Sequence, residues 1–175
     1  MNKLLCNLRC NQALCKLSEG DMTGLAVLYD CMSRQIYALA LSVLKNPADA
    51  EDAMQETFLK VVQRIDTYRE GENARSWLLS IARNAAIDTL RKRKTSVSVE
   101  DPTVFEECAY REDPAQKLAL DEALMRLSQT DREIVVMRAV WGMRFGEIAS
   151  VAGVQKSAVE KRYRRALDKL KSFLD

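Results

Sequence analysis

The chain has 175 residues, of which 47% are hydrophobic and 30% charged, and its formal net charge is only +2. This size suits one large domain or two small ones, and because no run of about 20 apolar residues exists, we expect no membrane insertion. The chain has no histidine and no glycine-rich phosphate-binding loop, so we expect no enzymatic activity, no cofactor and no small-molecule substrate. Glycine (6) and proline (3) are scarce, which predicts an all-α fold.

Charges of one sign are nonetheless clustered along the chain. Residues 91–94 carry four cations, and residues 156–171 carry seven cations against two acids. Residues 49–56 carry four acids, and residues 100–113 carry six acids against one cation. Such segregation indicates that different faces of the protein meet different partners.

The N-terminal segment, residues 1–17, precedes the first predicted domain, has mixed polarity and could form a short helix. Its apolar run is too short for a signal peptide and is interrupted by Asn7, Arg9 and Asn11, so we expect a cytoplasmic protein. In that compartment the five cysteines of the chain are expected to be free thiols.

Two helices are predicted after a turn at residues 18–21. The first covers residues 22–44, whose apolar residues recur at helical spacing. The second begins at Asn46 and Pro47, with the asparagine as cap and the proline at the first helical position, and extends to about residue 65.

A third helix, residues 75–94, follows a polar loop over residues 66–73 and ends in the basic block. Its buried side is marked by Trp77, Ile81 and Ile87. The residues left to face outward are Arg83, Asn84, Arg91 and Lys92. A helix with one apolar face, an outward surface of amide and cations, and a basic end is suited to lie against nucleic acid.

A second helical unit is predicted beyond a linker. Residues 95–114 contain two of the three prolines and many acids, so we expect a flexible acidic linker. A helix over residues 115–127 follows, and a capping box at residues 130–133 begins the next helix, which Gly142 ends.

Residues 147–163 have the two-helix spacing of a helix-turn-helix. Gly153 is expected in the turn, and the apolar anchors of the two helices are Ile148, Ala152, Val159 and Tyr163. The sequence therefore predicts two small helical domains, residues 18–94 and 115–175, the second of which contains a helix-turn-helix.

Three blocks of this sequence together resemble bacterial RNA polymerase sigma factors of the extracytoplasmic-function (ECF) group. Residues 49–59 resemble the helix that binds core polymerase, residues 75–93 the reader of the −10 promoter element, and the stretch from residue 127 through the helix-turn-helix the −35 reader. The resemblance covers roughly residues 17–174, with a gap in the linker. It implies that residues 18–94 are sigma region 2, that residues 115–175 are sigma region 4, and that the protein directs core RNA polymerase to promoter DNA.

The resemblance also implies which residues make contacts. An acidic helix face with one aromatic residue suits a basic clamp on core polymerase, because charge steers encounter and the aromatic ring supplies buried area. These core-polymerase contacts are expected from Asp49, Glu51, Asp52, Gln55, Glu56 and Phe58.

Contacts to the −10 element are expected on the non-template single strand, where Asn84 matches the family position beside a captured base. The residues assigned to this strand are Tyr68, Arg83, Asn84, Asp88, Arg91 and Lys92. Contacts to the −35 element are expected in the major groove. The residues assigned to the groove and its phosphates are Arg138, Lys156, Ser157, Glu160, Lys161, Arg164 and Arg165.

Two positions depart from the family pattern. Glu160 stands where a cation is common, and its carboxylate repels phosphate but can accept a hydrogen bond from cytosine, so the −35 sequence cannot be transferred from relatives. Arg144 replaces the usual small cap before the first helix of the motif, and Gly146 weakens that turn, which predicts a weak helix start.

Other interpretations stay open at this point. A stand-alone helix-turn-helix regulator would have no need of the block at residues 75–94, and a helical adaptor that binds only proteins would show no salt-dependent affinity for DNA. The acidic linker is either a solvated tether or, by resemblance, a segment that threads the RNA path of the polymerase. The resemblance also implies an anti-sigma factor as a partner.

The cysteines raise the question of a metal site. Cys6 and Cys10 lie one helical turn apart and Cys15 follows, but a zinc site needs four ligands as a rule and the chain has no histidine. Cys31 could supply a fourth sulfur only if the fold brings it close. We expect small buried side chains or inert thiols, and no metal site.

Overall fold

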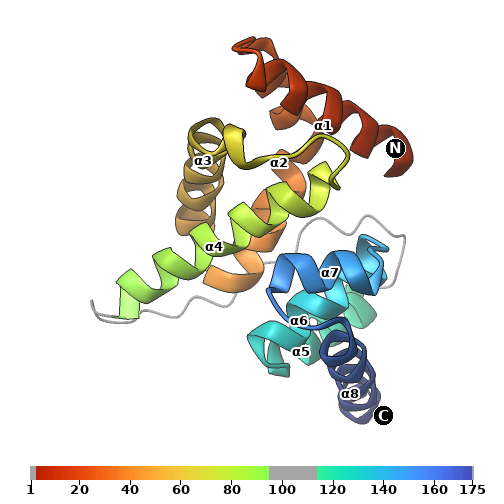
Figure 1. Cartoon of the computed structure of the whole chain (residues 1–175). Helices are drawn as coiled ribbons and strands as arrows, with labels where there is room; N and C mark the ends of the chain where they lie inside the picture. The colour runs from red at the N-terminus through yellow and green to blue at the C-terminus, as the bar shows by residue number, and fades with distance from the viewer. Residues whose placement is uncertain (1–2, 95–113, 175) are drawn as a thin grey trace. The chain divides into compact units, whose positions relative to one another are not determined.

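The computed structural model describes residues 3–94 and 114–174, and every regular element within these ranges is helical (Figure 1). The chain divides into two units, Met1–Pro102 and Thr103–Asp175. The prediction of an all-α fold with two helical domains is therefore confirmed. The predicted linker lies outside the described residues except at Pro114, where a helix begins.

Unit 1, the N-terminal unit, is built around one central helix. Its elements are α1 (Lys3–Ser18), α2 (Thr23–Leu44), α3 (Pro47–Gln63), the 3-10 turn η1 (Ile65–Thr67) and α4 (Ala74–Lys94). α2 packs against α1, α3 and α4, and α3 also packs against α4. Each large apolar side chain that this packing removes from water contributes about 1.5–3 kcal/mol. The most deeply buried of them are Leu14, Leu28, Met32, Ile36, Leu39, Leu78 and Leu79.

The N-terminal segment is an integral part of unit 1. The expected short helix is the 16-residue helix α1, in which Cys10, Ala13 and Leu14 are at most 2% exposed. α1 and α2 approach so closely at Gly24 that an added Cβ there would overlap the carbonyl oxygen of Ala13. Treating residues 1–17 as a lead outside the domain therefore understates their structural role.

The start of α3 follows the prediction. The Asn46 side chain accepts a hydrogen bond from the backbone N–H of Asp49 at 3.0 Å, and Pro47 occupies the first helical position. Because the amide satisfies a donor that the helix cannot, this cap stabilises the helix by about 1 kcal/mol. α3 ends at Gln63, and the expected end at residue 65 lies instead in η1.

Unit 2, the C-terminal unit, has shorter helices. Its elements are α5 (Pro114–Arg126), α6 (Gln129–Val135), a π-helical turn η2 (Val136–Val140), α7 (Phe145–Ala152) and α8 (Lys156–Leu174). α8 packs against α5, α6 and α7. One apolar cluster of this unit consists of Ala123, Leu127, Val135, Ala166 and Leu170.

The cap of α6 differs from the predicted one. The hydroxyl of Ser128, not that of Thr130, accepts the backbone N–H of Asp131 at 3.3 Å. Within the helix that Ser128 caps, Arg132 is buried. Arg132 donates to the carbonyl oxygens of the residues that end α5 and follow it, with distances of 2.9 Å to Leu124 and 3.1 Å to both Met125 and Leu127.

The helix-turn-helix is formed by α7 and α8. Gly153 has a φ of +67° in the turn, a backbone conformation that favours glycine. Ile148 and Val159 are fully buried as predicted, while Val151 is buried where Ala152 was expected. Arg144 supplies no side-chain cap, but the Glu147 carboxylate accepts its backbone N–H at 2.6 Å, which offsets the weak start predicted for α7.

Candidate polymerase and nucleic-acid interfaces

The acidic residues of α3 lie on the side of the helix away from the core. Glu51, Asp52, Gln55 and Glu56 are exposed. Glu56 lies 3.5 Å from the ammonium of Lys60, one turn along the same helix. The outward side of α3 therefore carries acids together with one glutamine amide, and their attraction for a basic partner is only partly offset.

Asp49 belongs to the same predicted set but is engaged inside unit 1. Its carboxylate accepts a hydrogen bond from the guanidinium of Arg93 in α4 at 2.9 Å, and both side chains are about one third exposed. An ion pair of this exposure contributes at most about 1 kcal/mol. The pair ties the start of α3 to the end of α4.

Phe58, which was assigned to the core-polymerase contacts, lies in the core of unit 1. It is 7% exposed, and its ring packs against that of Tyr29 in α2 with 5.2 Å between centroids. The reason is its register, because Phe58 shares the stripe of Ala50, Ala53 and Val61 that faces the core. This burial agrees with the helical spacing of the sequence, and the contact of Phe58 with core polymerase stays a prediction. The exposed apolar side chains of these two helices are Tyr29 (49% exposed) and Leu59 (60%), which sequence periodicity alone did not single out.

The first turn of α4 is held by asparagine side chains. Three of its backbone N–H groups, which have no partner within the helix, donate to amide oxygens. The pairs are Ala74 with Asn11 at 3.3 Å, Arg75 with Asn7 at 3.2 Å, and Ser76 with Asn73 at 3.0 Å. Two of these caps come from α1, so α1 fixes where α4 begins.

Tyr68, predicted to contact DNA, is bound within unit 1. Its hydroxyl lies 3.1 Å from both the amide oxygen of Asn11 and the carbonyl oxygen of Glu72, and its ring meets Trp77 edge-on at 5.3 Å. Burial, with smaller effects from Cys15 and Glu72, raises the pKa of the Tyr68 hydroxyl. Tyr68 therefore shapes the loop before α4 and keeps its proton at neutral pH.

The outward face of α4 carries the remaining predicted −10 residues. Asn84, Arg91 and Lys92 are exposed, and Arg83 is half-buried. Asp88 lies 3.7 Å from Lys60 of α3 and 3.9 Å from Arg91, so its negative charge is compensated on both sides. The buried stripe is richer in alanine than expected, because Ala82, Ala85 and Ala86 line it, whereas the predicted Trp77 and Ile87 are only half-buried.

The outward face of α8 is basic. Lys156, Ser157, Lys161, Arg164 and Arg165 are all exposed, and Val159 and Ala166 on the opposite side are fully buried. Glu160 is half-buried and lies 3.8 Å from Lys156. Within the described ranges, Lys161, Arg164 and Arg165 make no ion pair, so these three charges can meet phosphate without first breaking an internal contact.

Arg138 is placed by contacts within unit 2. Its guanidinium donates to the carbonyl oxygen of Met143 at 3.0 Å and lies 4.7 Å from the ring centroid of Phe145. A cation over an aromatic face contributes about 0.5–1 kcal/mol when exposed to solvent. Arg138 is thus held beside the start of α7, with its charge near the helix-turn-helix.

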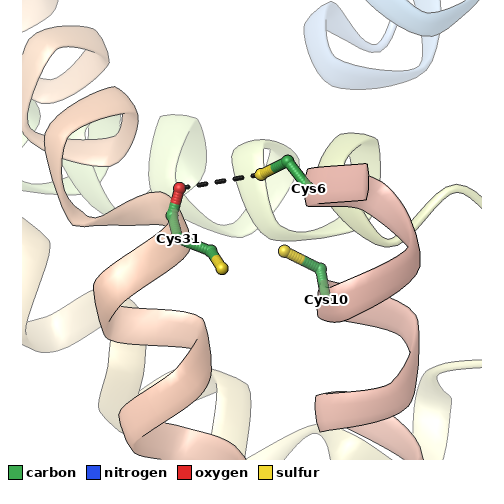
Figure 2. A group of neighbouring side chains, drawn as sticks. All are labelled: Cys6, Cys10 and Cys31. Atoms are coloured by element: carbon green, nitrogen blue, oxygen red, sulfur yellow. Dashed lines mark hydrogen bonds between the residues drawn. The ribbon is translucent and has the colours of Figure 1, made fainter. Parts of the chain in front are cut away.

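Three of the five cysteines meet between α1 and α2. Figure 2 shows Cys6 and Cys10 on α1 directed toward Cys31 on α2. Their Sγ atoms all lie within 4.8 Å of one another, and Cys15 is not part of the group. The Cys6 thiol donates to the carbonyl oxygen of Cys31 at 3.8 Å. Burial raises the pKa of the Cys10 thiol well above its usual range, and burial also raises that of Cys31.

Two family models match the chain. Sigma-70 region 2 matches residues 28–95, which include α3 and α4, and Sigma-70, region 4 matches residues 117–170, which include the helix-turn-helix. The chain is an ECF sigma factor. It is thus a transcription initiation factor that binds core RNA polymerase and directs it to promoters. The region 2 match begins within α2, so α1 lies outside both matched ranges.

Relatives of known function agree with this assignment. This sigma factor is 33% identical to RNA polymerase sigma factor SigV of Bacillus subtilis (strain 168) over 148 residues, which cover 83% of this chain and 89% of that protein. It is 31% identical to sigma factor CarQ of Myxococcus xanthus over 163 residues, which cover 91% of this chain and 94% of that protein.

Two solved structures resemble this sigma factor. One is CnrH in complex with the cytosolic domain of CnrY, with a TM-score of 0.73, 25% identity and coverage of 95% of this chain and 97% of that chain. The other is the sigma factor RpoE of Bartonella quintana in complex with the anti-sigma factor NepR, with a TM-score of 0.71 and 24% identity over 91% of this chain and 97% of that chain. At 24% identity, the second likeness is evidence for the fold alone.

These comparisons decide between the interpretations left open by the sequence. A stand-alone helix-turn-helix regulator is not supported, because the N-terminal unit of this sigma factor matches region 2. Sigma factors are initiation factors rather than enzymes. None of the helices in the described part of the chain is long and apolar enough to cross a bilayer.

Proposed function

We propose that this sigma factor uses three separate surfaces to start transcription: the outward side of α3 for core polymerase, the outward face of α4 for the −10 single strand, and the outward face of α8 for the −35 duplex. The observation that carries the proposal is the exposed basic face of α8 within a helix-turn-helix, in a chain that also matches region 2. The sigma factor has no catalytic activity of its own and acts in the cytoplasm, where the polymerase works.

The polymerase surface combines charge with exposed apolar area. The acids Glu51 and Asp52, with Gln55, steer encounter with a basic partner surface. Tyr29 and Leu59 take the role first given to Phe58, because they expose the apolar area that an interface core requires. Asp49 contributes indirectly by tying α3 to α4.

The −10 surface is the outward face of α4. Asn84 hydrogen-bonds the edge of a base drawn out of the non-template strand, and Arg83, Arg91 and Lys92 hold the backbone. Asp88 orients Arg91, since the two side chains are 3.9 Å apart.

The −35 surface is the N-terminal half of α8. Lys156 and Ser157 reach base edges in the major groove, while Lys161, Arg164 and Arg165 hold phosphates and Arg138 adds a further charge beside the motif. Glu160 faces the same groove, where its carboxylate accepts from a cytosine amino group. Its pairing with Lys156 keeps that carboxylate from facing phosphate with its full charge.

Run-off transcription tests the promoter assignment. Purified core polymerase is given fragmented genomic DNA of the source organism, with and without the sigma factor, and start sites are mapped. Discrete starts that require the sigma factor are expected, and their upstream sequences give both promoter elements.

A substitution at Asn84 tests the reading of the −10 base. Replacing Asn84 by alanine is expected to reduce initiation about tenfold or more, because the captured base loses its hydrogen-bond partner. Gln12→Ala, which removes an exposed amide side chain from α1, is the matched control and should have no effect. Equal initiation by the Asn84→Ala and Gln12→Ala variants would contradict base reading by Asn84.

Co-elution with core polymerase tests the α3 surface. Leu59→Asp is expected to weaken co-elution, because it places a charge in the apolar part of the interface. Leu8→Asp changes an equally exposed leucine (54%) on α1 and should leave binding unchanged. If both variants bind core polymerase like the unmodified protein, α3 is not the contact surface.

We further propose that an anti-sigma factor covers the same exposed side of α3. Support comes from the two structural neighbours, each of which is a sigma factor solved with a bound protein partner. A regulator that occupies Tyr29 and Leu59 would exclude core polymerase by direct competition. The expected signature is mutually exclusive binding: adding core polymerase releases the anti-sigma factor, and Leu59→Asp weakens both complexes. A ternary complex of all three proteins would contradict this arrangement.

A further inference from the structure

The cysteine cluster of unit 1 is not explained by transcription initiation. Cys6, Cys10 and Cys31 are 7%, 0% and 8% exposed, and they come from two helices that are adjacent in the fold (Figure 2). A buried cysteine usually acts as a small apolar side chain that fills space. Here three thiols converge on one point, with every pair of sulfur atoms within 4.8 Å.

The spacing of the sulfurs fits one metal ion. With metal–sulfur bonds of about 2.3 Å, three sulfurs arranged around a single ion lie about 4 Å apart. The sulfur atoms already lie within 4.8 Å of one another on two helices that pack together. Small rotations of the side chains therefore suffice to bring them to the separation that one ion requires. Bound in this way, the ion would sit between α1 and α2 with little contact with water.

The donor set restricts which ion can bind. Thiolate ligands select soft ions such as Cu(I), Zn(II) and those of iron–sulfur clusters, and structural zinc requires four ligands. Among the described residues no other cysteine, histidine, aspartate or glutamate offers a ligand atom to the group. Three sulfur ligands shielded from water suit an ion that binds stably with three ligands. This favours Cu(I) over Zn(II).

We propose that Cys6, Cys10 and Cys31 form a three-sulfur site for one monovalent copper ion. Each thiol that becomes a ligand releases its proton to solvent, and copper keeps its oxidation state throughout. The positive charge of Arg9, on α1 between the two cysteines, acts on Cys31 and offsets part of the negative charge that the thiolates bring. The site departs from the expectation that these cysteines are inert, because the sequence did not show that Cys31 meets α1.

Copper binding would act on α4 through α1. Cys6 and Cys10 alternate along α1 with Asn7 and Asn11, the two residues whose amides hold the first turn of α4. An ion that links α1 to α2 therefore also restrains the caps of α4. Any effect of copper on promoter binding rests on the proposed function of α4. The metal site itself does not depend on that function.

The first test is a competition titration of the full chain with Cu(I). The reduced protein, kept free of oxygen, competes with a chromophoric Cu(I) chelator, and the colour lost gives stoichiometry and affinity. One equivalent of Cu(I) per chain is expected. Cys10→Ser is expected to weaken Cu(I) binding at least about a hundredfold. Removing a residue that only hydrogen-bonds to a metal ligand typically lowers affinity about 10–100-fold, and removing the ligand itself costs more. Cys15→Ser is the control on the same helix, and it should bind Cu(I) like the unmodified chain.

Two further measurements keep the proposal testable if Cys10→Ser folds poorly. X-ray absorption of the Cu(I)-loaded unmodified chain should show three sulfur neighbours and no nitrogen or oxygen ligand. Alkylation with and without Cu(I), in enough urea for the reagent to reach the three buried thiols, followed by mass spectrometry, should show Cys6, Cys10 and Cys31 protected by copper and Cys15 unprotected. Binding that survives in a folded Cys10→Ser variant, or protection of Cys15 instead of Cys31, would overturn the proposal.

A parallel titration with Zn(II) tests the choice of ion. Zn(II) is titrated in the same way against a chromophoric zinc chelator, and weaker relative occupancy than with Cu(I) is expected. Tight 1:1 Zn(II) binding with a fourth ligand in the absorption spectrum would overturn the three-ligand argument. Because no polymerase or DNA is present, the outcome is independent of whether the promoter assignment holds.

Discussion

The two units of this sigma factor hold their basic helices in different ways. In unit 1, α4 is fastened along its length: asparagine amides bind its first turn, Lys60 approaches Asp88, and Arg93 bonds Asp49. In unit 2, α8 is held mainly by apolar burial, and its cations at positions 161, 164 and 165 make no ion pair in the part of the chain that the structure describes. Under the roles proposed for the two helices, the one that contacts an unpaired strand needs a fixed position, since that strand imposes no regular geometry. A helix that enters a regular groove can keep its charges available for phosphate.

The largest effect is expected from Arg132, the one fully buried cation of unit 2 among the described residues. Arg132→Met removes the guanidinium donor from the carbonyl oxygens of Leu124, Met125 and Leu127, of which Leu124 keeps the backbone N–H of Leu127. Each unsatisfied buried group costs about 1–3 kcal/mol, so we expect a loss of about 3 kcal/mol in the free energy of unfolding of unit 2. Urea unfolding measures it. Arg165→Met, an exposed arginine of the same unit, is the control, and a similar loss in both variants would contradict this role of Arg132.

A somewhat smaller effect is expected at the contact of α1 with α2. Gly24→Ala forces a Cβ against the carbonyl oxygen of Ala13 and should destabilise unit 1 by about 1–3 kcal/mol. Gly146→Ala is the matched control, because a Cβ there meets no atom within 4 Å in a helix of unit 2. The control should be neutral or stabilising by up to about 1 kcal/mol. Thermal unfolding of both variants distinguishes close packing from a general intolerance of side chains.

Removing one cap of α4 should have a local effect of about 1 kcal/mol. Asn7→Ala leaves the backbone N–H of Arg75 without its partner, and loss of a helix cap costs about 0.5–2 kcal/mol. Hydrogen exchange of the amides at residues 74–77 should become faster, while exchange in α3 stays unchanged. Gln12→Ala, at an exposed position of α1, provides the comparison. Unchanged exchange at residues 74–77 in Asn7→Ala would show that α1 does not hold this turn.

The smallest effect is expected from the ion pair between Asp49 and Arg93. Both side chains are about one third exposed, so a double-mutant cycle with Asp49→Asn and Arg93→Gln should give a coupling of at most about 1 kcal/mol. This coupling should fall as salt is raised, because exposed charges are screened. A larger coupling that does not depend on salt would mean that the pair is more deeply enclosed than its exposure indicates.

Much of this architecture follows from local sequence. Asn46 and Pro47 predict the start of α3, and Gly153 predicts the turn of the helix-turn-helix, because in each case neighbouring residues decide the backbone conformation. The cap of α6 was misplaced because Ser128 and Thr130 both precede an acid by three residues. Local sequence does not choose between the two, and in the folded unit the helix begins after Ser128.

The features of unit 1 that the sequence did not reveal have the same origin. Helical spacing places Phe58 in the buried stripe of α3, but it does not show that Leu59 and Tyr29 stay exposed, because their exposure depends on what the rest of unit 1 covers. Cys31 is separated from Cys6 by 25 residues, and their meeting depends on the close approach of α1 to α2 at Gly24. The function of the chain was predictable from its motifs, whereas the cysteine cluster required the fold.

The caps that α1 provides also affect how the protein is made. Asn7 leaves the ribosome well before the backbone group that it binds, which lies 68 positions later in the chain. Because synthesis adds roughly 5–20 residues per second, α4 emerges on the order of seconds after α1. During that interval its side-chain amides have no native partners on α4, and unit 1 cannot finish folding. The newly made sigma factor therefore completes the start of α4 only after α4 has followed α1 out of the ribosome.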